Sequence, residues 1–288
     1  MIPAQFEYHA PTSVKEALQL LTTLPDAKLL AGGHSLLPLM KFRLVSPPHV
    51  IDLGGIRDLR YIKDAASGLA VGALATHWMI ESSALVKAKA PVLAEAAGHI
   101  GDLQVRNLGT IGGSLAHADP AADYPAAVLA LGAEMTTEGS SGRRSIPATE
   151  FFTGLFATAV KPDEILVEIK VPALPPRTGT SYLKFAHPAS GFAVVGVAAV
   201  ITLDGKGRCE RARIGITGVG PAGYRARAVE DLLTGKALND QVIASAAEKA
   251  ADGVDANEDL FASADYRRHL SRVFTKRAIH AALQRAGA

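Results

Sequence analysis

Two short glycine-containing segments carry the residues of this sequence that are best suited to binding an anion. The first is Ala31-Gly32-Gly33-His34-Ser35, directly after Leu29-Leu30, and the second is Thr110-Ile111-Gly112-Gly113-Ser114. Glycine has no Cβ, so backbone N–H groups in such loops can turn outward toward a phosphate, and hydroxyls add further donors. Each loop suits a phosphate, and two loops suit a diphosphate. The alternative for either loop alone is an ordinary turn, because Gly-Gly pairs are common there.

Polar side chains cluster after the second loop. His117, Asp119 and Asp123 have spacings at which they could bind a metal ion, but no fourth ligand converges with them, so no metal site is predicted. The aspartates can cap a turn and a helix, and Asp123 can also accept hydrogen bonds from a ligand. His34 and His117 could donate to a phosphate or stack on a ring, although isolated histidines are usually structural.

Motifs for hydrolysis are absent. The sequence contains no C-x-x-C, H-E-x-x-H or G-x-S-x-G, and Gly33-His34-Ser35 departs from the last pattern at Leu37. A hydrolase using Ser35 and His117 is therefore the least supported function, and no catalytic residue is predicted. The first loop also lacks the G-x-G-x-x-G spacing of a Rossmann dinucleotide site.

The elements around the first loop predict a small βαβ-like unit. Ser13 and Glu16 have the spacing of a capping box, so a helix is expected from residue 14, and strands are expected at 28–31 and 50–53. The next segments predict a hairpin (59–62 with 68–74) and two helices (76–89 and 91–100) before the second loop. A helix at 124–131 and strands at 134–137, 144–146 and 165–171 follow, with a turn at 151–154. The middle of the chain is thus α+β with a mostly antiparallel sheet.

A linker rich in proline, at 172–179, separates the remainder, where three strands (182–186, 192–203 and 211–217) precede three helices (228–233, 241–252 and 263 to the end). The predicted domains are residues 1–57, 58–176 and 177–288. No internal repeat is apparent.

Composition narrows the class of protein. The 288 residues are 48% hydrophobic, and 30 basic against 28 acidic residues give a net charge of +2, with charges too scattered for a nucleic-acid surface. One cysteine, Cys209, excludes an internal disulfide and an iron–sulfur cluster bound by this chain alone. No signal peptide or membrane-spanning run is present, so we expect a cytoplasmic protein without a membrane span.

Both glycine loops, together with Ile2 to Tyr8 at one end and Phe261 to Arg267 at the other, resemble the FAD-binding medium subunit of the molybdenum hydroxylases, the carbon monoxide dehydrogenase and xanthine dehydrogenase family. The resemblance covers nearly the whole chain. It implies a two-part FAD-binding domain of the PCMH type, made of the βαβ-like unit and the antiparallel α+β unit. A C-terminal domain of three antiparallel strands and a helix bundle follows.

The resemblance also implies cofactor-binding positions. The first loop would wrap the diphosphate and the second would be the other phosphate loop, with Ser114 where relatives often have Asn. The implied FAD-binding residues are Lys28, Leu29, Leu30, Ala31, Gly32, Gly33, His34, Ser35, Ile100, Thr110, Gly112, Gly113, Ser114, His117, Asp119, Asp123, Leu166, Lys184 and Phe192. Near the isoalloxazine, relatives commonly carry an acidic residue where this chain has Gly191. We expect that loss, and the charge of Lys184, to ease flavin reduction.

The function implied by the resemblance is electron transfer. A large molybdopterin-containing subunit would oxidise the substrate, and a small subunit would pass electrons through [2Fe-2S] clusters to the FAD of this chain and on to an external acceptor. The expected assembly is a dimer of heterotrimers. The alternatives are a stand-alone FAD-dependent oxidoreductase on the same scaffold and a non-catalytic scaffold that has lost its flavin.

Overall fold

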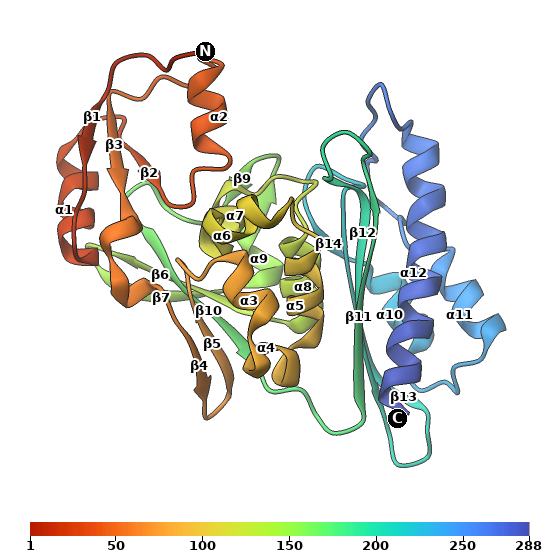
Figure 1. Ribbon diagram of the computed structural model, residues 1–288. Coiled ribbons are helices and arrows are strands. Elements are labelled where there is room, and N and C mark those ends of the chain that lie inside the picture. The colour runs from red at the N-terminus through yellow and green to blue at the C-terminus, as the bar shows by residue number, and fades with distance from the viewer. Residues whose placement is uncertain (288) are drawn as a thin grey trace.

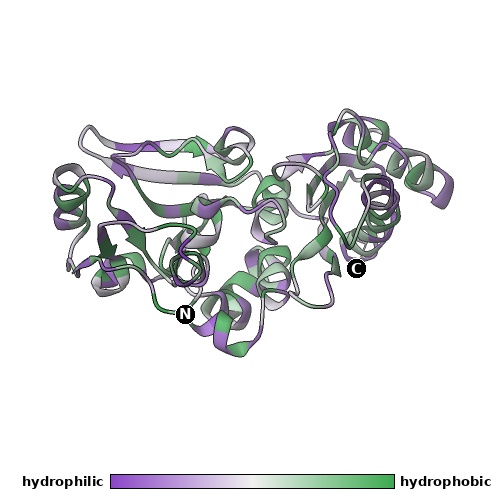
Figure 2. Cartoon of the chain, turned by 90° about the horizontal axis from the view of Figure 1, so that it is seen from above, coloured by the Kyte–Doolittle hydropathy of each residue, from purple (hydrophilic) through white to green (hydrophobic). Residues whose placement is uncertain are grey.

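The chain folds into three units arranged in a row, each built on its own β-sheet (Figure 1). The structure is a computed structural model and describes residues 1–287. The N-terminal sheet and the C-terminal helices lie at opposite ends of the molecule in both ribbon views (Figures 1 and 2). Within the described residues, no helix is long and apolar enough to cross a bilayer.

The N-terminal unit is a parallel sheet of order β1-β3-β2 with helix α1 packed on it. Ala17 of α1 and Ile51 of β3 are fully buried between them, and the Ser13 hydroxyl caps α1 by accepting from the Glu16 N–H at 3.2 Å. The βαβ-like prediction is confirmed. The elements are β1 (Glu7–His9), α1 (Val14–Thr23), β2 (Lys28–Leu30), α2 (Leu36–Lys41), β3 (His49–Asp52), and the short 3₁₀ turns η1 (Leu53–Gly55) and η2 (Arg57–Leu59).

The middle unit is a five-stranded sheet of order β4-β5-β10-β6-β7, and its strands are antiparallel, as the sequence predicts. Its helices build the largest hydrophobic core, in which every residue of α8 is buried. The elements are β4 (Ile62–Ala65), β5 (Gly68–Gly72), α3 (His77–Ser82), α4 (Ala84–Lys89), α5 (Pro91–Gly98), α6 (Leu103–Leu108), α7 (Ile111–His117), α8 (Tyr124–Leu131), β6 (Glu134–Gly139), β7 (Gly142–Pro147), α9 (Ala148–Phe151), β8 (Phe152–Gly154), β9 (Ala157–Thr158) and β10 (Ile165–Pro172).

Several local expectations for this unit are wrong. The single helix expected at 76–89 is two helices, because Ser83 adopts an extended conformation and its hydroxyl caps α4. Helix α6 was not foreseen, residues 59–61 precede β4 and are not part of a strand, and the turn expected at 151–154 is the end of α9 followed by β8. The second glycine segment is the start of helix α7, and not a loop.

The C-terminal unit is an antiparallel sheet of order β11-β12-β13-β14. Every residue of β12 is buried, because α12 covers one face of the sheet while α5 and α8 of the middle unit cover the other (Figure 1). The short β14 adds to the three predicted strands. Hydrophilic and hydrophobic residues are mixed around the C-terminal helices, as expected for helices with one buried face (Figure 2). The elements are β11 (Thr178–Ala186), β12 (Ala193–Leu203), β13 (Cys209–Thr217), β14 (Tyr224–Arg225), α10 (Arg227–Leu233), α11 (Asp240–Ala247) and α12 (Ala264–Ala286).

Candidate functional site

A cavity of about 700 Å³ lies where the three units meet. Its walls come from β2 and the loop after it, from α7 and the segments flanking it, and from the β11–β12 loop at 190–192. The predicted binding residues that line it are Lys28, Leu29, Leu30, Ala31, Gly32, Gly33, His34, Ser35, Ile100, Thr110, Gly112, Gly113, Ser114, His117, Asp119, Asp123, Leu166 and Phe192. The fold thus gathers residues that are far apart in sequence around one space.

The loop after β2 lines this cavity and contains a run of free backbone donors. Within residues 1–287, nothing accepts a hydrogen bond from the backbone N–H groups of Gly32, Gly33, His34 or Ser35. The chain turns at Gly33, which has a φ of +76°, and the carbonyl of Gly33 accepts from the Leu37 N–H at 3.0 Å to start α2. Consecutive unpaired amides in a concave loop form a site for an anion such as a phosphate.

The second glycine segment contributes in a different way from the one expected. The Gly112 N–H donates to the Ala73 carbonyl at 2.9 Å, and the Gly113 N–H donates to the Thr110 hydroxyl at 3.1 Å. These amides are therefore used inside the protein, and the expectation that they turn outward is wrong. A Cβ at Gly112 would lie 2.6 Å from the Cβ and carbonyl oxygen of Ala73, so glycine is needed there for close packing. The hydroxyl of Ser114 remains a donor on the cavity wall.

The two glycine segments pack directly against each other. A Cβ at Gly32 would lie 2.6 Å from Cα of Gly109, and a Cβ at Gly113 would lie 3.7 Å from Cβ of Ala31. Gly32 thus allows the first loop to approach the backbone that leads into α7. The contact places the free amides of residues 32–35 and the hydroxyl-bearing start of α7 on one continuous surface of the cavity.

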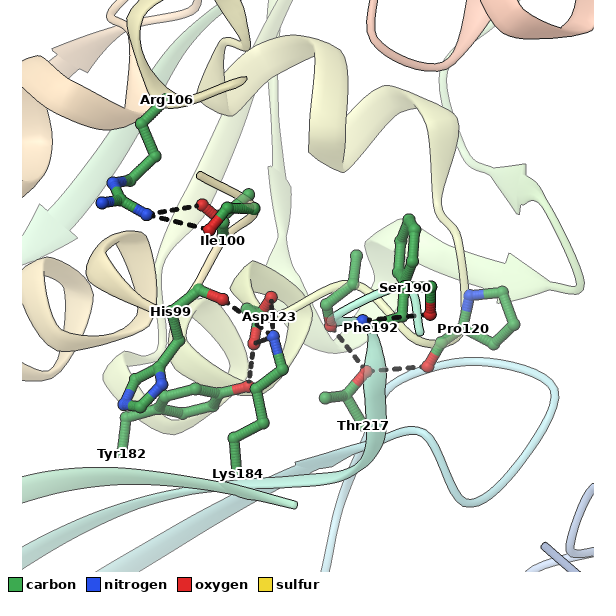
Figure 3. Close-up of polar contacts among 12 residues, drawn as sticks. His99, Ile100, Arg106, Pro120, Asp123, Tyr182, Lys184, Ser190, Phe192 and Thr217 are labelled. Carbon is green, nitrogen blue, oxygen red and sulfur yellow. Dashed lines mark hydrogen bonds and ion pairs between the residues drawn. The ribbon is translucent and has the colours of Figure 1, made fainter. Parts of the chain in front are cut away.

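Asp123 anchors a buried polar network at the side of the cavity (Figure 3). Its carboxylate accepts from the Tyr182 hydroxyl at 2.6 Å and from Nζ of Lys184, which lies 2.8 Å from Oδ1. Nζ of Lys184 also donates to the His99 carbonyl at 2.9 Å. Burial raises the pKa of Asp123, while Lys184 and Tyr182 act in the opposite direction.

This network corrects two expectations. Lys184, expected at the cofactor, is not among the described residues that line the cavity, and its charge compensates Asp123. Asp123 precedes α8 without a side-chain capping bond. Asp119 does form the expected turn, since its Oδ1 accepts from the Ala121 N–H at 2.8 Å.

Arg106 positions the segment that carries Ile100. Its Nη1 donates to the carbonyls of Ile100 and Gly101, both at 3.0 Å (Figure 3). Its Nε lies 2.8 Å from Oε2 of Glu81. The two groups form an ion pair, but their geometry is not that of a hydrogen bond. Sequence reasoning missed Arg106, because α6 itself was not predicted.

His77 lines the cavity and is another residue that the sequence reasoning missed. Its Nδ1 lies 3.0 Å from the hydroxyl of the fully buried Tyr124. Burial lowers the pKa of His77 to about 3, and electrostatic interaction with His34 and Arg106 lowers it further. The imidazole is therefore neutral near pH 7. The only available signal was the position of His77 directly after a helix-capping threonine.

The other chemistries considered from the sequence gain no geometric support. Among residues 1–287, the one group of three or more metal-ligating side chains with converging atoms does not include His117, Asp119 or Asp123. No hydrogen bond joins Ser35 to His117 in the described chain; His117 packs instead against Phe156, with ring centroids 5.1 Å apart. A hydrolytic pair is therefore absent from this cavity.

Comparison with known proteins identifies the family. Residues 4–174 match the FAD binding domain in molybdopterin dehydrogenase, and residues 180–282 match the CO dehydrogenase flavoprotein C-terminal domain. The chain belongs to the FAD-binding medium subunits of the molybdenum hydroxylase family. As a medium subunit, it is a flavoprotein oxidoreductase subunit with FAD as its cofactor, and the predicted fold class is confirmed.

Relatives of this medium subunit match over the full length. The carbon monoxide dehydrogenase medium chain of Hydrogenophaga pseudoflava is 43% identical over 99% of each chain. A solved structure of carbon monoxide dehydrogenase from the same organism superposes with a TM-score of 0.96 at 45% identity, covering 99% of each chain. Quinoline 2-oxidoreductase from Pseudomonas putida 86 gives a TM-score of 0.94 at 38% identity, covering 100% of each chain.

The residues around the cavity fit FAD on structural grounds. The free amides of residues 32–35 offer neutral donors of the kind a diphosphate needs, without a buried cation. Leu29, Leu30, Leu74 and Ile165 supply apolar wall for aromatic rings.

Each sheet lies within one predicted domain, while the domain boundaries at 57 and 176 stay predictions.

Proposed function

We propose that this medium subunit holds FAD in the cavity between its three units and transfers electrons through it. The binding residues would be the cavity-lining set predicted from the sequence, with Lys184 acting behind the wall through Asp123. The observation that carries the proposal is the run of unpaired N–H groups at residues 32–35, all four of which line a cavity of about 700 Å³. Bound there, FAD would supply the capacity to accept and release electrons.

The chain's own residues have positioning tasks. The amides of the first loop and the hydroxyls of Thr110 and Ser114 would bind the diphosphate, and the apolar wall would exclude water from the rings. Arg106 and Lys184 fix the carbonyls of residues 99–101 beside the cavity. No acid–base residue is required for electron transfer, which agrees with the absence of a predicted catalytic residue.

The proposed partners follow from the family. Relatives are named medium chains or subunits of complexes, including a glyceraldehyde dehydrogenase medium chain of Sulfolobus acidocaldarius, 37% identical over 96% of this chain. We infer a large molybdopterin-containing subunit that oxidises the substrate and a small [2Fe-2S] subunit that delivers the electrons, in a dimer of heterotrimers. An external acceptor would then take the electrons from this chain.

Two measurements test the proposal. The purified chain should show a flavin spectrum with about one FAD per chain, and native purification should recover a molybdopterin-containing chain and an iron–sulfur chain with it. Flavin without partners would favour the stand-alone oxidoreductase, and a colourless chain that cannot be reconstituted would contradict both functions.

The first loop offers a matched pair of variants for this test. Ser35→Pro removes one free N–H group that lines the cavity, whereas Ser35→Ala keeps it. FAD retention should fall in the proline variant and persist in the alanine variant. Equal retention in both would remove the support that the loop amides give.

A further inference from the structure

The N-terminal sheet brings one glutamate and two histidines together at a place that the FAD cavity does not use. Glu7 and His9 are two residues apart on β1, and His49 begins β3 beside them (Figure 1). The strands pair in parallel, with Glu7 directly opposite His49. Because side chains alternate along a strand, all three project from the same side of the sheet. None of the three lines the cavity.

The ligand atoms of these residues have the separations expected around one tetrahedral cation. Nε2 of His9 lies 3.4 Å from Nδ1 of His49, which lies 3.3 Å from Oε2 of Glu7. Ligand atoms bound to Zn²⁺ at about 2.0–2.1 Å lie roughly 3.3–3.4 Å from one another. The remaining separation, from His9 Nε2 to Glu7 Oε2, is 3.9 Å.

Packing fixes the two imidazoles and leaves the carboxylate adjustable. The side chains of His9 and His49 are 24% and 16% exposed, whereas that of Glu7 is 73% exposed. A small rotation of Glu7 therefore closes the longer separation without disturbing the core. The Glu7 N–H donates to the Pro48 carbonyl at 2.8 Å, which holds the two strands in register at this position. Among residues 1–287, this is the only group of metal-ligating side chains whose atoms converge in this way.

We propose that Glu7, His9 and His49 form a binding site for Zn²⁺. Two neutral imidazoles and one carboxylate suit zinc and the neighbouring transition-metal dications better than Mg²⁺ or Ca²⁺, which prefer oxygen ligands. The exposed side of the site leaves a fourth position for water. The cation links the edge strand β1, three residues long, to β3 in the centre of its sheet, and so stabilises the sheet whose third strand leads into the first glycine loop.

Metal titration of the FAD-containing full chain tests this site. Any polyhistidine tag is removed and the protein is dialysed against a chelator before calorimetry with ZnCl₂. One Zn²⁺ should bind per chain and raise the melting temperature. Co²⁺ in place of Zn²⁺ should give the visible absorption of a tetrahedral complex with nitrogen and oxygen ligands.

Three variants identify the ligands. His9→Gln and His49→Gln should each weaken Zn²⁺ binding by more than the roughly 10- to 100-fold lost when only an outer-shell partner is changed, and Glu7→Gln should weaken it less than either. The matched control is His269→Gln, which removes an exposed histidine from α12 in another unit and should bind Zn²⁺ like the unmodified chain. Flavin content and the melting temperature without metal verify that each variant is folded.

Two outcomes would overturn the site. One is failure of the unmodified chain to bind Zn²⁺, which would mean that the two imidazoles are joined only by a hydrogen bond. The other is unchanged Zn²⁺ stoichiometry in folded His9→Gln and His49→Gln chains, which would place bound metal elsewhere. The flavin function survives either result, because the two sites share no residue.

Discussion

Nζ of Lys184 lies 2.8 Å from Oδ1 of Asp123, and 61 positions of sequence separate the two residues. Both side chains are almost fully buried, and they belong to different units, since Asp123 precedes α8 and Lys184 lies on β11. The ion pair therefore joins the C-terminal sheet to the wall of the cavity proposed to hold FAD.

Removing the cation from this pair should destabilise the chain strongly. Lys184→Met leaves a buried carboxylate without its cation, which typically costs about 3–5 kcal/mol. Denaturant unfolding at a fixed excess of FAD measures the loss. Lys249→Met is the control, because Lys249 and Asp252 form an exposed pair, with side chains 50% and 55% exposed, worth about 0–1 kcal/mol.

A double variant separates the cost of the uncompensated charge from the cost of lost packing. Adding Asp123→Asn to Lys184→Met removes the uncompensated charge, so part of the lost free energy should return. If the double variant is no more stable than Lys184→Met, the cost comes from lost packing of the lysine stem, and the charge is not responsible.

Glycine pairs, caps and apolar alternation act locally, so the sequence predicts most of the elements and their order, whereas most residues of the cavity wall are expected only from the family resemblance. Ser13, Pro91 and Ser263 begin helices where expected. The exceptions have tertiary causes. Residues 111–117 form a helix despite two glycines, since the carbonyls of Ala73 and Ala75 accept from the start of that segment. The pairs Asp123–Lys184 and His77–Tyr124 connect distant segments, so no local pattern reveals them.

Substitution of Gly112 should damage folding first and flavin binding as a consequence. Gly112→Ala places a Cβ 2.6 Å from Ala73, and overpacking of this kind typically costs about 1–3 kcal/mol. Gly205→Ala is the control, because a Cβ at Gly205 meets nothing within 4 Å. Melting temperature and FAD content are measured together. A Gly112→Ala chain that melts like the unmodified protein but has lost FAD would show that Gly112 acts by direct contact with the cofactor.

His77 should make stability depend on pH in mildly acidic solution. Its pKa is about 3 in the folded chain and 6.5 ordinarily, so between these values the unfolded chain binds the extra proton. The contribution of His77 is complete above about pH 6.5 and decreases toward pH 3, by up to about 1.4 kcal/mol per pH unit. Glu164, whose pKa is lowered to about 2 mainly by its hydrogen bond to Arg144, contributes stability that is complete above its ordinary pKa of 4.5 and is lost only as the pH falls below that value.

Between pH 6.5 and 4.5, the contribution of His77 therefore changes while that of Glu164 stays constant. Urea unfolding across this interval should show a flatter pH dependence for His77→Gln than for the unmodified chain. His269→Gln, which removes an exposed histidine, should keep the original slope. An unchanged slope in His77→Gln would mean that His77 does not cause the acid sensitivity.

Gly191 offers a direct test of how the chain sets the flavin potential. The residue lines the cavity, and a Cβ there meets nothing within 4 Å, so a side chain fits the space. Its φ of +72° is a conformation that Asp and Asn tolerate better than most residues. Gly191→Asp should lower the reduction potential, because a carboxylate disfavours added negative charge on the flavin. Gly191→Asn has the same shape and the same backbone strain without the charge.

The difference between these two variants isolates the electrostatic effect. A unit charge acting through an effective dielectric of about 20 contributes on the order of 1–2 kcal/mol at roughly 8–16 Å, which corresponds to tens of millivolts. Spectroscopic titration of each FAD-containing chain against a dye of known potential measures the difference. Equal potentials in the Asp and Asn variants would place position 191 too far from the flavin, or too well solvated, to affect it. In that case, the buried Asp123–Lys184 pair would be examined next, and as a neutralised pair it predicts little net effect.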